Sequence, residues 1–319
     1  MRKLLTIAAC GVLALGAAAC GDDDDENNSS SSSGSGSGDG GDVSGPINID
    51  GSSTVGPFAQ AAAEGFQAQY PDVKITVGTS GTGGGFEKFC AGETDISDAS
   101  RPIKDDEEVP ICKKAGIDYK EVQVANDGIS VVTNPELKVD CLTVEQLKKL
   151  WNEGSKVKNL SEIDPSLPDT ELSLFGPGTD SGTFDFFTDE INGEEGVSRK
   201  DYQPSEDDNV LVQGVEGEAG GLGYFGFSYY EQNQDKLNLV GVDAGSGCVT
   251  PASDTIQSGD YKPLSRPLFM YPAVKSLDKP QVKAFMDYVL ENQESIAEAA
   301  QIVPMNQAQA DEATTALGS

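Results

Sequence analysis

The sequence predicts an α/β fold with a mostly parallel sheet, and three observations support this. β-rich segments alternate with helical segments along most of the chain, a pattern typical of α/β domains. About 275 residues follow a low-complexity N-terminal stretch, which is enough for two lobes of ordinary size. Glycine is abundant, with 37 residues, as expected where many loops need unusual backbone angles.

The first part of this region alternates regularly. We expect strands at 46–50, 73–77 and 95–100, a helix at 57–69 and another helix that begins with residues 86–90. A proline opens the first helix and another proline follows its end, as helix boundaries often do.

The later part alternates more loosely. A long extended run covers 122–132, and Thr143 with Gln146 forms a capping box for a helix that ends near Trp151. Further strands are expected at 172–175, 220–227 and 268–271, and helices after 183, from about 280, and at 292–300.

The first twenty residues resemble a lipoprotein signal. Arg2 and Lys3 precede an apolar run of about a dozen residues, and small residues lead to Cys20. The run is too short to span a bilayer as a stable helix. We expect a signal peptide over 1–19 and lipid attachment at Cys20. Cys10 also fits locally but leaves almost no apolar run before it, and an ordinary signal peptide is the alternative.

Residues 20–45 are an acidic run followed by serine, glycine and asparagine. With almost no apolar side chains this segment cannot bury a core, so we expect a disordered tether. A lipid at its start would hold the folded part near a membrane without inserting it.

The composition excludes several classes of function. The formal net charge is −31, which disfavours nucleic acid because phosphate backbones require basic surfaces. We interpret the acidity as surface charge that favours solubility. The chain has no histidine, so it lacks the commonest general base and the commonest metal ligand, and we expect no metal and no cofactor.

Four cysteines follow the leader: Cys90, Cys112, Cys141 and Cys248. None forms a Cys-x-x-Cys pair, and outside the cytoplasm four cysteines suggest two disulfides. Of the three possible pairings we favour Cys90–Cys112, which closes a local loop, with Cys141–Cys248.

Three loops share one design, in which a strand is followed by small Ser, Thr and Gly residues and then by a helix. They are 51–56, 79–85 and 179–183. Helix N-termini present unpaired N–H groups, and glycine lets a ligand approach the backbone, so each loop is a half-shell for an anion. One such loop is more often only a helix cap. Three in one chain favour an oxyanion site.

Two other interpretations of these loops fail. No Gly-Lys-Ser/Thr sequence ends any of them, which excludes a nucleotide P-loop. Ser53 or Ser181 could be a nucleophile, but without histidine the familiar triad is impossible.

The expected mature chain has three arginines: Arg101, Arg199 and Arg266. Arg101 follows a buried strand at the edge of a loop, where a planar guanidinium suits an oxyanion. For Arg199 and Arg266 we favour structural salt bridges.

Several segments together resemble the PstS-type phosphate-binding proteins. They are 50–55, 78–86, 94–103, 175–183 and 221–226, and they follow the family's order between about residues 46 and 310.

The resemblance implies a type II periplasmic-binding-protein fold, in which two α/β lobes are joined by a hinge of two crossings. We place the crossings near 126–129 and 261–268. The first lobe would comprise 46–127 plus 263–319, and the second 128–262.

The resemblance also implies a ligand set between the lobes. Ser53, Thr54 and the Val55 N–H would contact phosphate, with either Ser80 or Thr82 from the second loop. Ser181, Gly182 and Thr183 match the family's Ser-Gly-Thr in the second lobe. Arg101, singled out above by its position after a buried strand, would add the cation.

The chain departs from one branch of the family. That branch has an arginine before the Ser-Gly-Thr loop and an aspartate after the third strand, where this chain has Pro177 and Arg101. We expect Asp185 or Asp180 to pair with the arginine or to accept the proton of monohydrogen phosphate. An acidic acceptor would repel sulfate, which carries no proton.

The expected function is phosphate capture outside the cytoplasmic membrane and delivery to an ABC-type permease, by a monomeric lipoprotein that is not an enzyme. One alternative is another oxyanion, such as sulfate or molybdate. A surface phosphatase or adhesin on the same fold is the other, since fold does not fix function.

Overall fold

The structure is a computed structural model that describes residues 43–318. The predicted signal peptide, Cys20 and most of the predicted tether lie outside the described residues. No helix within the described range is long and apolar enough to cross a membrane.

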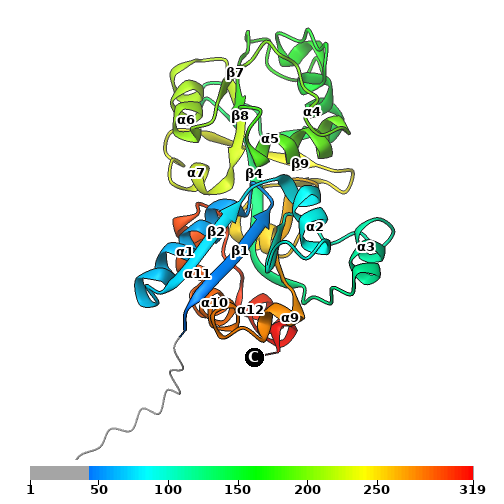
Figure 1. Ribbon diagram of the computed structural model, residues 1–319. Coiled ribbons are helices and arrows are strands. Elements are labelled where there is room, and N and C mark those ends of the chain that lie inside the picture. Colours follow the sequence, from blue (N-terminus) through cyan, green and yellow to red (C-terminus); the bar gives the residue numbers. More distant parts are fainter. Residues whose placement is uncertain (1–42, 319) are drawn as a thin grey trace, which may run out of the picture. The chain divides into compact units, whose positions relative to one another are not determined.

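Two α/β lobes are joined by two long strands, β4 and β11 (Figure 1). β4 covers Val122–Thr133 and β11 covers Ser265–Pro272. β11 pairs with β3 on one side and with β4 on the other, and the far end of β4 pairs with β8. One apolar cluster draws on residues 47–125 and 268–317, while another draws on residues 129–264 together with Val303.

The first lobe packs helices on both faces of a short sheet. Its strands are β1 (Gly45–Gly51), β2 (Val73–Gly78) and β3 (Ile96–Ala99). Its helices are α1 (Gly56–Gln69), α2 (Gly81–Cys90), α3 (Glu108–Ala115), α9 (Val274–Leu277), α10 (Pro280–Glu291), α11 (Gln293–Ala299) and α12 (Gln307–Leu317).

The second lobe is built from shorter elements. Its strands are β5 (Cys141–Thr143), β6 (Ser173–Pro177), β7 (Gln203–Ser205), β8 (Gly221–Gly226), β9 (Asn238–Asp243) and β10 (Cys248–Val249). Its helices are α4 (Val144–Trp151), α5 (Gly182–Phe187), α6 (Asp208–Gly217), α7 (Phe227–Glu231) and α8 (Ser253–Gln257), with a 3-10 turn at Leu160–Glu162 and a π-helical turn at Thr188–Asn192.

The sheet is mixed, so the expectation of a mostly parallel sheet is only partly correct. β1 pairs in parallel with β2 and β3, and β6 pairs in parallel with β7 and β8. β11 is antiparallel to both β3 and β4. The reason is topological, because the chain crosses between the lobes once in each direction.

Two local predictions are wrong. The second helix begins at Gly81, not near Phe86, although four of its first five residues are glycines. A Cβ at Gly85 would lie 2.5 Å from the Cα of Gly51, so glycine allows α2 to pack directly on β1. A third C-terminal helix, α12, was not predicted, although Asn306 and Gln309 form a capping box at its start.

A third segment also reaches the junction of the lobes. The N–H groups of Asn126 and Val303 each donate to the other residue's carbonyl oxygen, at 2.8 and 3.0 Å, and the Asn126 side chain donates to Pro304 O at 3.1 Å. Val303 is 3% exposed and packs in the second lobe's apolar cluster, whereas α12 returns to the first lobe's cluster.

The structure contains both disulfides of the favoured pairing, Cys90–Cys112 and Cys141–Cys248. The second joins β5 to β10, which both pair with β9. A Cβ at Gly241 of β9 would lie 2.5 Å from the Cys248 sulfur, so glycine makes room for the bridge.

Replacing Cys141 and Cys248 together with alanine is expected to lower the free energy of unfolding by about 2–5 kcal/mol. The two cysteines are 107 positions apart in the sequence, so the bridge closes a long loop and lowers the conformational entropy of the unfolded chain. Urea denaturation of the oxidised proteins measures the difference. A variant as stable as the parent would contradict the prediction.

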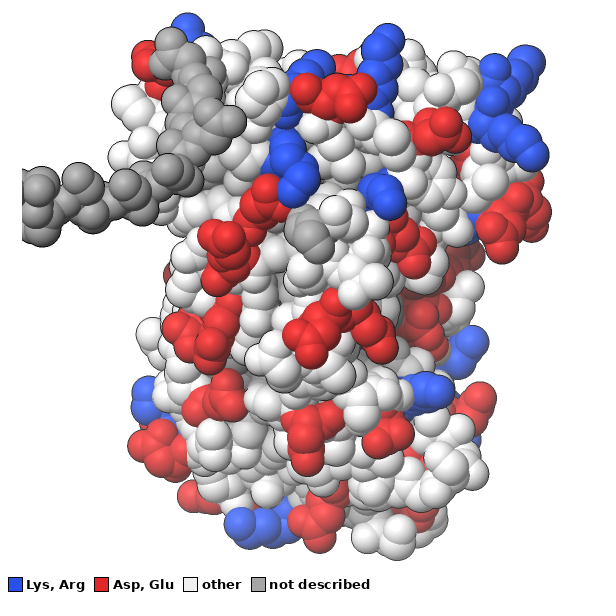
Figure 2. All heavy atoms as spheres, turned by 90° about the horizontal axis from the view of Figure 1, so that it is seen from below, with Lys and Arg blue, Asp and Glu red and all other residues white. Residues whose placement is uncertain are grey.

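Carboxylates are spread over the surface. On the face seen from below, Asp and Glu side chains are scattered among uncharged residues, with Lys and Arg interspersed (Figure 2). The described part of this face shows no continuous basic patch.

Candidate functional site

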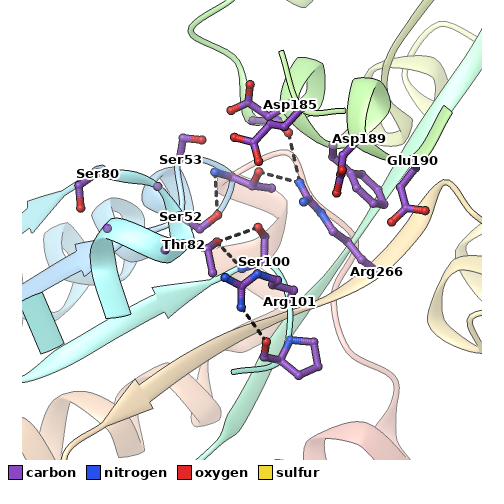
Figure 3. Close-up of a pocket in the computed structure, with 18 of the residues that line it drawn as sticks. Ser52, Ser53, Ser80, Thr82, Ser100, Arg101, Asp185, Asp189, Glu190 and Arg266 are labelled. Carbon is purple, nitrogen blue, oxygen red and sulfur yellow. Dashed lines mark hydrogen bonds between the residues drawn. The ribbon is translucent and has the colours of Figure 1, made fainter. Parts of the chain in front are cut away.

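A cavity of about 640 Å³ lies where the two lobes and the crossing strands meet (Figure 3). Its lining is strongly polar. The lining residues are Ser52, Ser53, Thr54, Ser80, Gly81, Thr82, Gly83, Gly84, Ser100, Arg101, Pro102, Lys104, Gly182, Asp185, Phe186, Asp189, Glu190, Glu195, Arg266 and Pro267. All three predicted anion loops contribute to it.

The first loop is fixed by its own backbone. Gly51 has φ +153°, and a Cβ there would lie 2.0 Å from Asp98 O, so the position requires glycine. Ser52 N donates to Asp98 O at 2.9 Å, and Thr54 N donates to the Ser52 hydroxyl at 3.2 Å. Ser53 and Thr54 therefore face the cavity, whereas Val55 is buried at the start of α1 and does not line it.

The two second-loop candidates differ in their surroundings. Ser80 donates through its hydroxyl and its N–H to the Asp50 carboxylate, which also binds Lys88 at 2.7 Å. Burial favours a higher pKa for Asp50, but the hydrogen bonds from Lys88 and Ser80 hold it below the usual value. Thr82 instead shares a hydrogen bond of 3.0 Å with the Ser100 hydroxyl, beside Arg101, while Ser80 lies apart from this group (Figure 3).

The third loop brings the second lobe against the first. Ser181 caps α5 by accepting a hydrogen bond from Thr183 N at 3.2 Å, and neither residue lines the cavity. Gly182 does line it. A Cβ at Gly182 would lie 2.2 Å from Thr54 Oγ1 and 2.8 Å from Ser53 Oγ, so the lobes touch here through a glycine.

Replacing Gly182 with alanine is therefore expected to hold the lobes apart and to weaken ligand binding by about tenfold or more, since a closed site needs contacts of hydrogen-bonding length. Alanine is a better helix former than glycine, so stability should not fall. Calorimetry with phosphate measures the effect. Gly217→Ala is the control, because a Cβ there meets nothing within 4 Å. Equal affinities for the two variants would contradict the prediction.

Arg101 lines the cavity but is already paired. Its Nη1 and Nη2 donate to the two carboxylate oxygens of Glu108, at 2.9 and 2.6 Å. The hydrogen bonds that Arg101 donates to Glu108 raise the pKa of Arg101. The side chain is 33% exposed, so its charge is partly screened by solvent.

Arg266, for which only a structural salt bridge was expected, lines the cavity near Asp185, Asp189 and Glu190 (Figure 3). Its Nη2 donates to Thr54 Oγ1 at 2.9 Å and to Gly182 O at 3.3 Å. We expected a structural salt bridge for Arg266, without a named partner, and the structure contains one to Asp127 at 3.1 Å. Burial lowers the pKa of Arg266, and Asp127 opposes that effect. Arg199 is also salt-bridged, to Asp201, away from this cavity.

Of the two nominated carboxylates, only Asp185 lines the cavity. It is half-buried, and its side-chain carboxylate forms no hydrogen bond with another described residue. Burial raises its pKa to about 6, Glu195 adds to the rise, and Arg266 opposes it. Asp180 is exposed, and its N–H donates to Glu206 at 3.3 Å. Asp189, Glu190 and Glu195 extend the acidic wall beside Asp185.

Within residues 43–318, no group of three or more His, Cys, Asp or Glu side chains could hold a metal ion. The cavity lining places hydroxyls, backbone N–H groups and guanidinium donors on one side and carboxylates on the other. Such a wall of donors suits an oxyanion, and the carboxylates suit an oxyanion that carries a proton.

Comparisons with known proteins agree with this geometry. A family model described as the PBP superfamily domain matches residues 28–293. The phosphate-binding protein PstS of Staphylococcus saprophyticus is 43% identical, with 84% of this chain and 82% of the relative covered. The chain belongs to the PBP superfamily, among the PstS-type phosphate-binding proteins.

Other relatives support the same assignment. Protein SphX of Synechococcus elongatus is 43% identical over 81% of this chain and 77% of its own. A crystal structure of a possible phosphate binding protein from Planctomyces limnophilus is 44% identical, with a TM-score of 0.81, covering 86% of this chain and 98% of that one. A Clostridium perfringens protein assigned as a phosphate ABC transporter substrate-binding protein, solved with bound phosphate, is 28% identical, with a TM-score of 0.57, covering 82% and 100%. The two-lobed fold expected for this family is confirmed.

Proposed function

We propose that this chain binds inorganic phosphate in the cleft between its lobes and delivers it to the permease of an ABC importer. The observation that carries the proposal is Arg266, a largely buried guanidinium among hydroxyls contributed by converging loops. The PstS relatives and the phosphate-bound Clostridium perfringens structure support phosphate as the anion.

The proposed ligand set revises the sequence-based one. Ser53, Thr54, Thr82, Gly182 and Arg101 stay in it, because each lines the cavity. Ser52, Ser100 and Arg266 join it for the same reason. Val55, Ser181 and Thr183 would act by shaping their loops, since none of them lines the cavity and the N–H groups of Ser181 and Thr183 already donate to Gly178 O and Ser181 Oγ. Asp185 is the proposed acceptor of the phosphate proton. Ser80 is a weaker candidate than Thr82, since Asp50 accepts its hydroxyl proton.

An acidic protein can bind an anion in this way because the interactions act at contact distance. Surface carboxylates are screened beyond about 8–10 Å at physiological salt, whereas donors inside a cleft are screened much less. Calorimetry with phosphate, sulfate and molybdate tests the proposal. Phosphate alone should bind at micromolar protein, and absence of phosphate binding would end it.

We further propose that the protein is a monomeric lipoprotein held outside the cytoplasmic membrane through Cys20, and that it is not an enzyme. The N-terminal signal and two disulfides, which persist in oxidising compartments, support the location. The placement of Ser181 at a helix cap and the lack of histidine argue against hydrolysis. Metabolic labelling with a fatty acid should mark the parent chain but not Cys20→Ser. Labelling of both would contradict the anchor.

A further inference from the structure

The Arg266 guanidinium is held from several directions at once. Nε and Nη2 donate to the same oxygen of Asp127, at 3.2 and 3.1 Å. Nη2 also donates to Thr54 Oγ1 and to the carbonyl of Gly182. The guanidinium carbon lies 3.8 Å from the centroid of the Phe186 ring. Nη1 donates to none of the described residues, which leaves that edge for a ligand.

These contacts come from three different parts of the fold. Thr54 belongs to the first lobe, Asp127 to the crossing strand β4, and Gly182 and Phe186 to α5 of the second lobe. Arg266 itself stands on the other crossing strand, paired in register with Asp127. The second lobe therefore holds Arg266 by one carbonyl and one aromatic ring, both carried by the same helix.

We propose that Phe186 is a positioning residue for anion capture: its ring face holds the Arg266 guanidinium across the cleft, so that lobe closure and the presentation of Arg266 to the anion occur together. This inference rests on the proposed binding of phosphate. Phe186 would thus act on the ligand indirectly, by holding Arg266, and would donate no hydrogen bond to the ligand from its side chain.

The physical argument depends on desolvation. A cation over an aromatic face is attracted by the ring quadrupole, and the attraction grows when water is excluded. Arg266 has a side-chain exposure of 14% and Phe186 is 6% exposed, so water reaches the pair poorly. A leucine at position 186 would fill space but would offer no quadrupole. The guanidinium would then be held only by its hydrogen bonds.

The test compares phosphate affinity and release among variants of the full mature chain. We expect Phe186→Leu to raise the phosphate Kd about tenfold, mainly through faster release. Replacing Phe186 with 4-fluoro- and 3,4,5-trifluorophenylalanine keeps its shape but weakens the quadrupole, so release should accelerate in step with fluorination. Phe187→Leu is the matched control. Its ring is fully buried, stacked on Tyr224 at 3.7 Å, and should affect stability but not the Kd.

Two results would overturn the inference while phosphate still binds: a Kd and a release rate that do not change across the fluorinated series, or equal losses for Phe186→Leu and Phe187→Leu. If the parent chain binds no phosphate, the proposed function fails, and a double-mutant cycle on unfolding then decides the contact. Coupling between Phe186→Leu and Arg266→Met of about threefold or more in the unfolding equilibrium supports it. Additive effects overturn it.

Discussion

Replacing Arg266 with methionine is expected to weaken phosphate binding by about 2–5 kcal/mol, or roughly 30- to 5,000-fold. The substitution removes the most buried cation of the cavity together with its hydrogen bonds to Thr54 and Gly182. Methionine keeps an unbranched side chain that can pack against Phe186. Calorimetry with phosphate measures the change.

Two further variants make the Arg266 result interpretable. Arg266→Met leaves the Asp127 carboxylate buried without its partner, so Arg266→Met with Asp127→Asn separates the lost donor from the leftover charge. Arg101→Met should cost less, within about tenfold, because Nη1 and Nη2 of Arg101 already donate to Glu108 and solvent screens the charge. If Arg101→Met lowered phosphate affinity more than Arg266→Met does, Arg101 and not Arg266 would be the main cation that binds phosphate.

Replacing Asp185 with asparagine is expected to relax the discrimination against sulfate by about a hundredfold or more. An ionised Asp185 can accept the proton of monohydrogen phosphate, but it repels sulfate. The asparagine amide is uncharged and can donate to any oxyanion. Competition calorimetry with sulfate against phosphate measures the ratio. Asp189→Asn, an exposed position on the same wall, is the control and should change the ratio little.

The same residue predicts a pH dependence whose sign can be worked out. The pKa of Asp185 is raised to about 6, so the carboxylate is charged above that pH and neutral below it. Wild-type protein should therefore reject sulfate at pH 7 to 8 and begin to bind it as the pH falls through about 6. Asp185→Asn should bind sulfate equally at both ends of this range. A wild-type profile for sulfate that is flat between pH 5 and 8 would contradict the assignment.

The sequence reveals the three loops because their signal is local. Small residues between a strand and a helix start are visible within six or seven positions, and the three loops were predicted from this pattern. The family resemblance, not the pattern, implied Ser53, Thr54, Gly182 and either Ser80 or Thr82 as ligands within them. The beginning of α2 was misplaced because Gly83, Gly84 and Gly85 are poor helix formers. Packing of Gly85 on Gly51 outweighs that propensity, and it is a tertiary effect.

Arg266 could not be identified by the same means. One arginine in an extended segment gives no local indication of a site, and its position depends on the antiparallel pairing of β4 with β11. A usable signal did exist. The two predicted crossings carry opposite charges, Asp127 in one and Arg266 in the other, and both crossings must border the cleft. The sequence also could not show whether Asp180 or Asp185 faces the cavity. Asp185 lies on α5 and lines the cavity, whereas Asp180 lies in the loop before this helix.

The third segment at the junction has a consequence for how the lobes can move. Two strands lying side by side can bend and can also twist about their common direction. Val303 is hydrogen-bonded to Asn126 on β4 and packs in the second lobe, while α12 is anchored in the first. We expect this additional attachment to resist twisting more than bending. The lobes should therefore open by hinge bending about a single axis. Each closure should then return Ser53 and Gly182 to the same relative position.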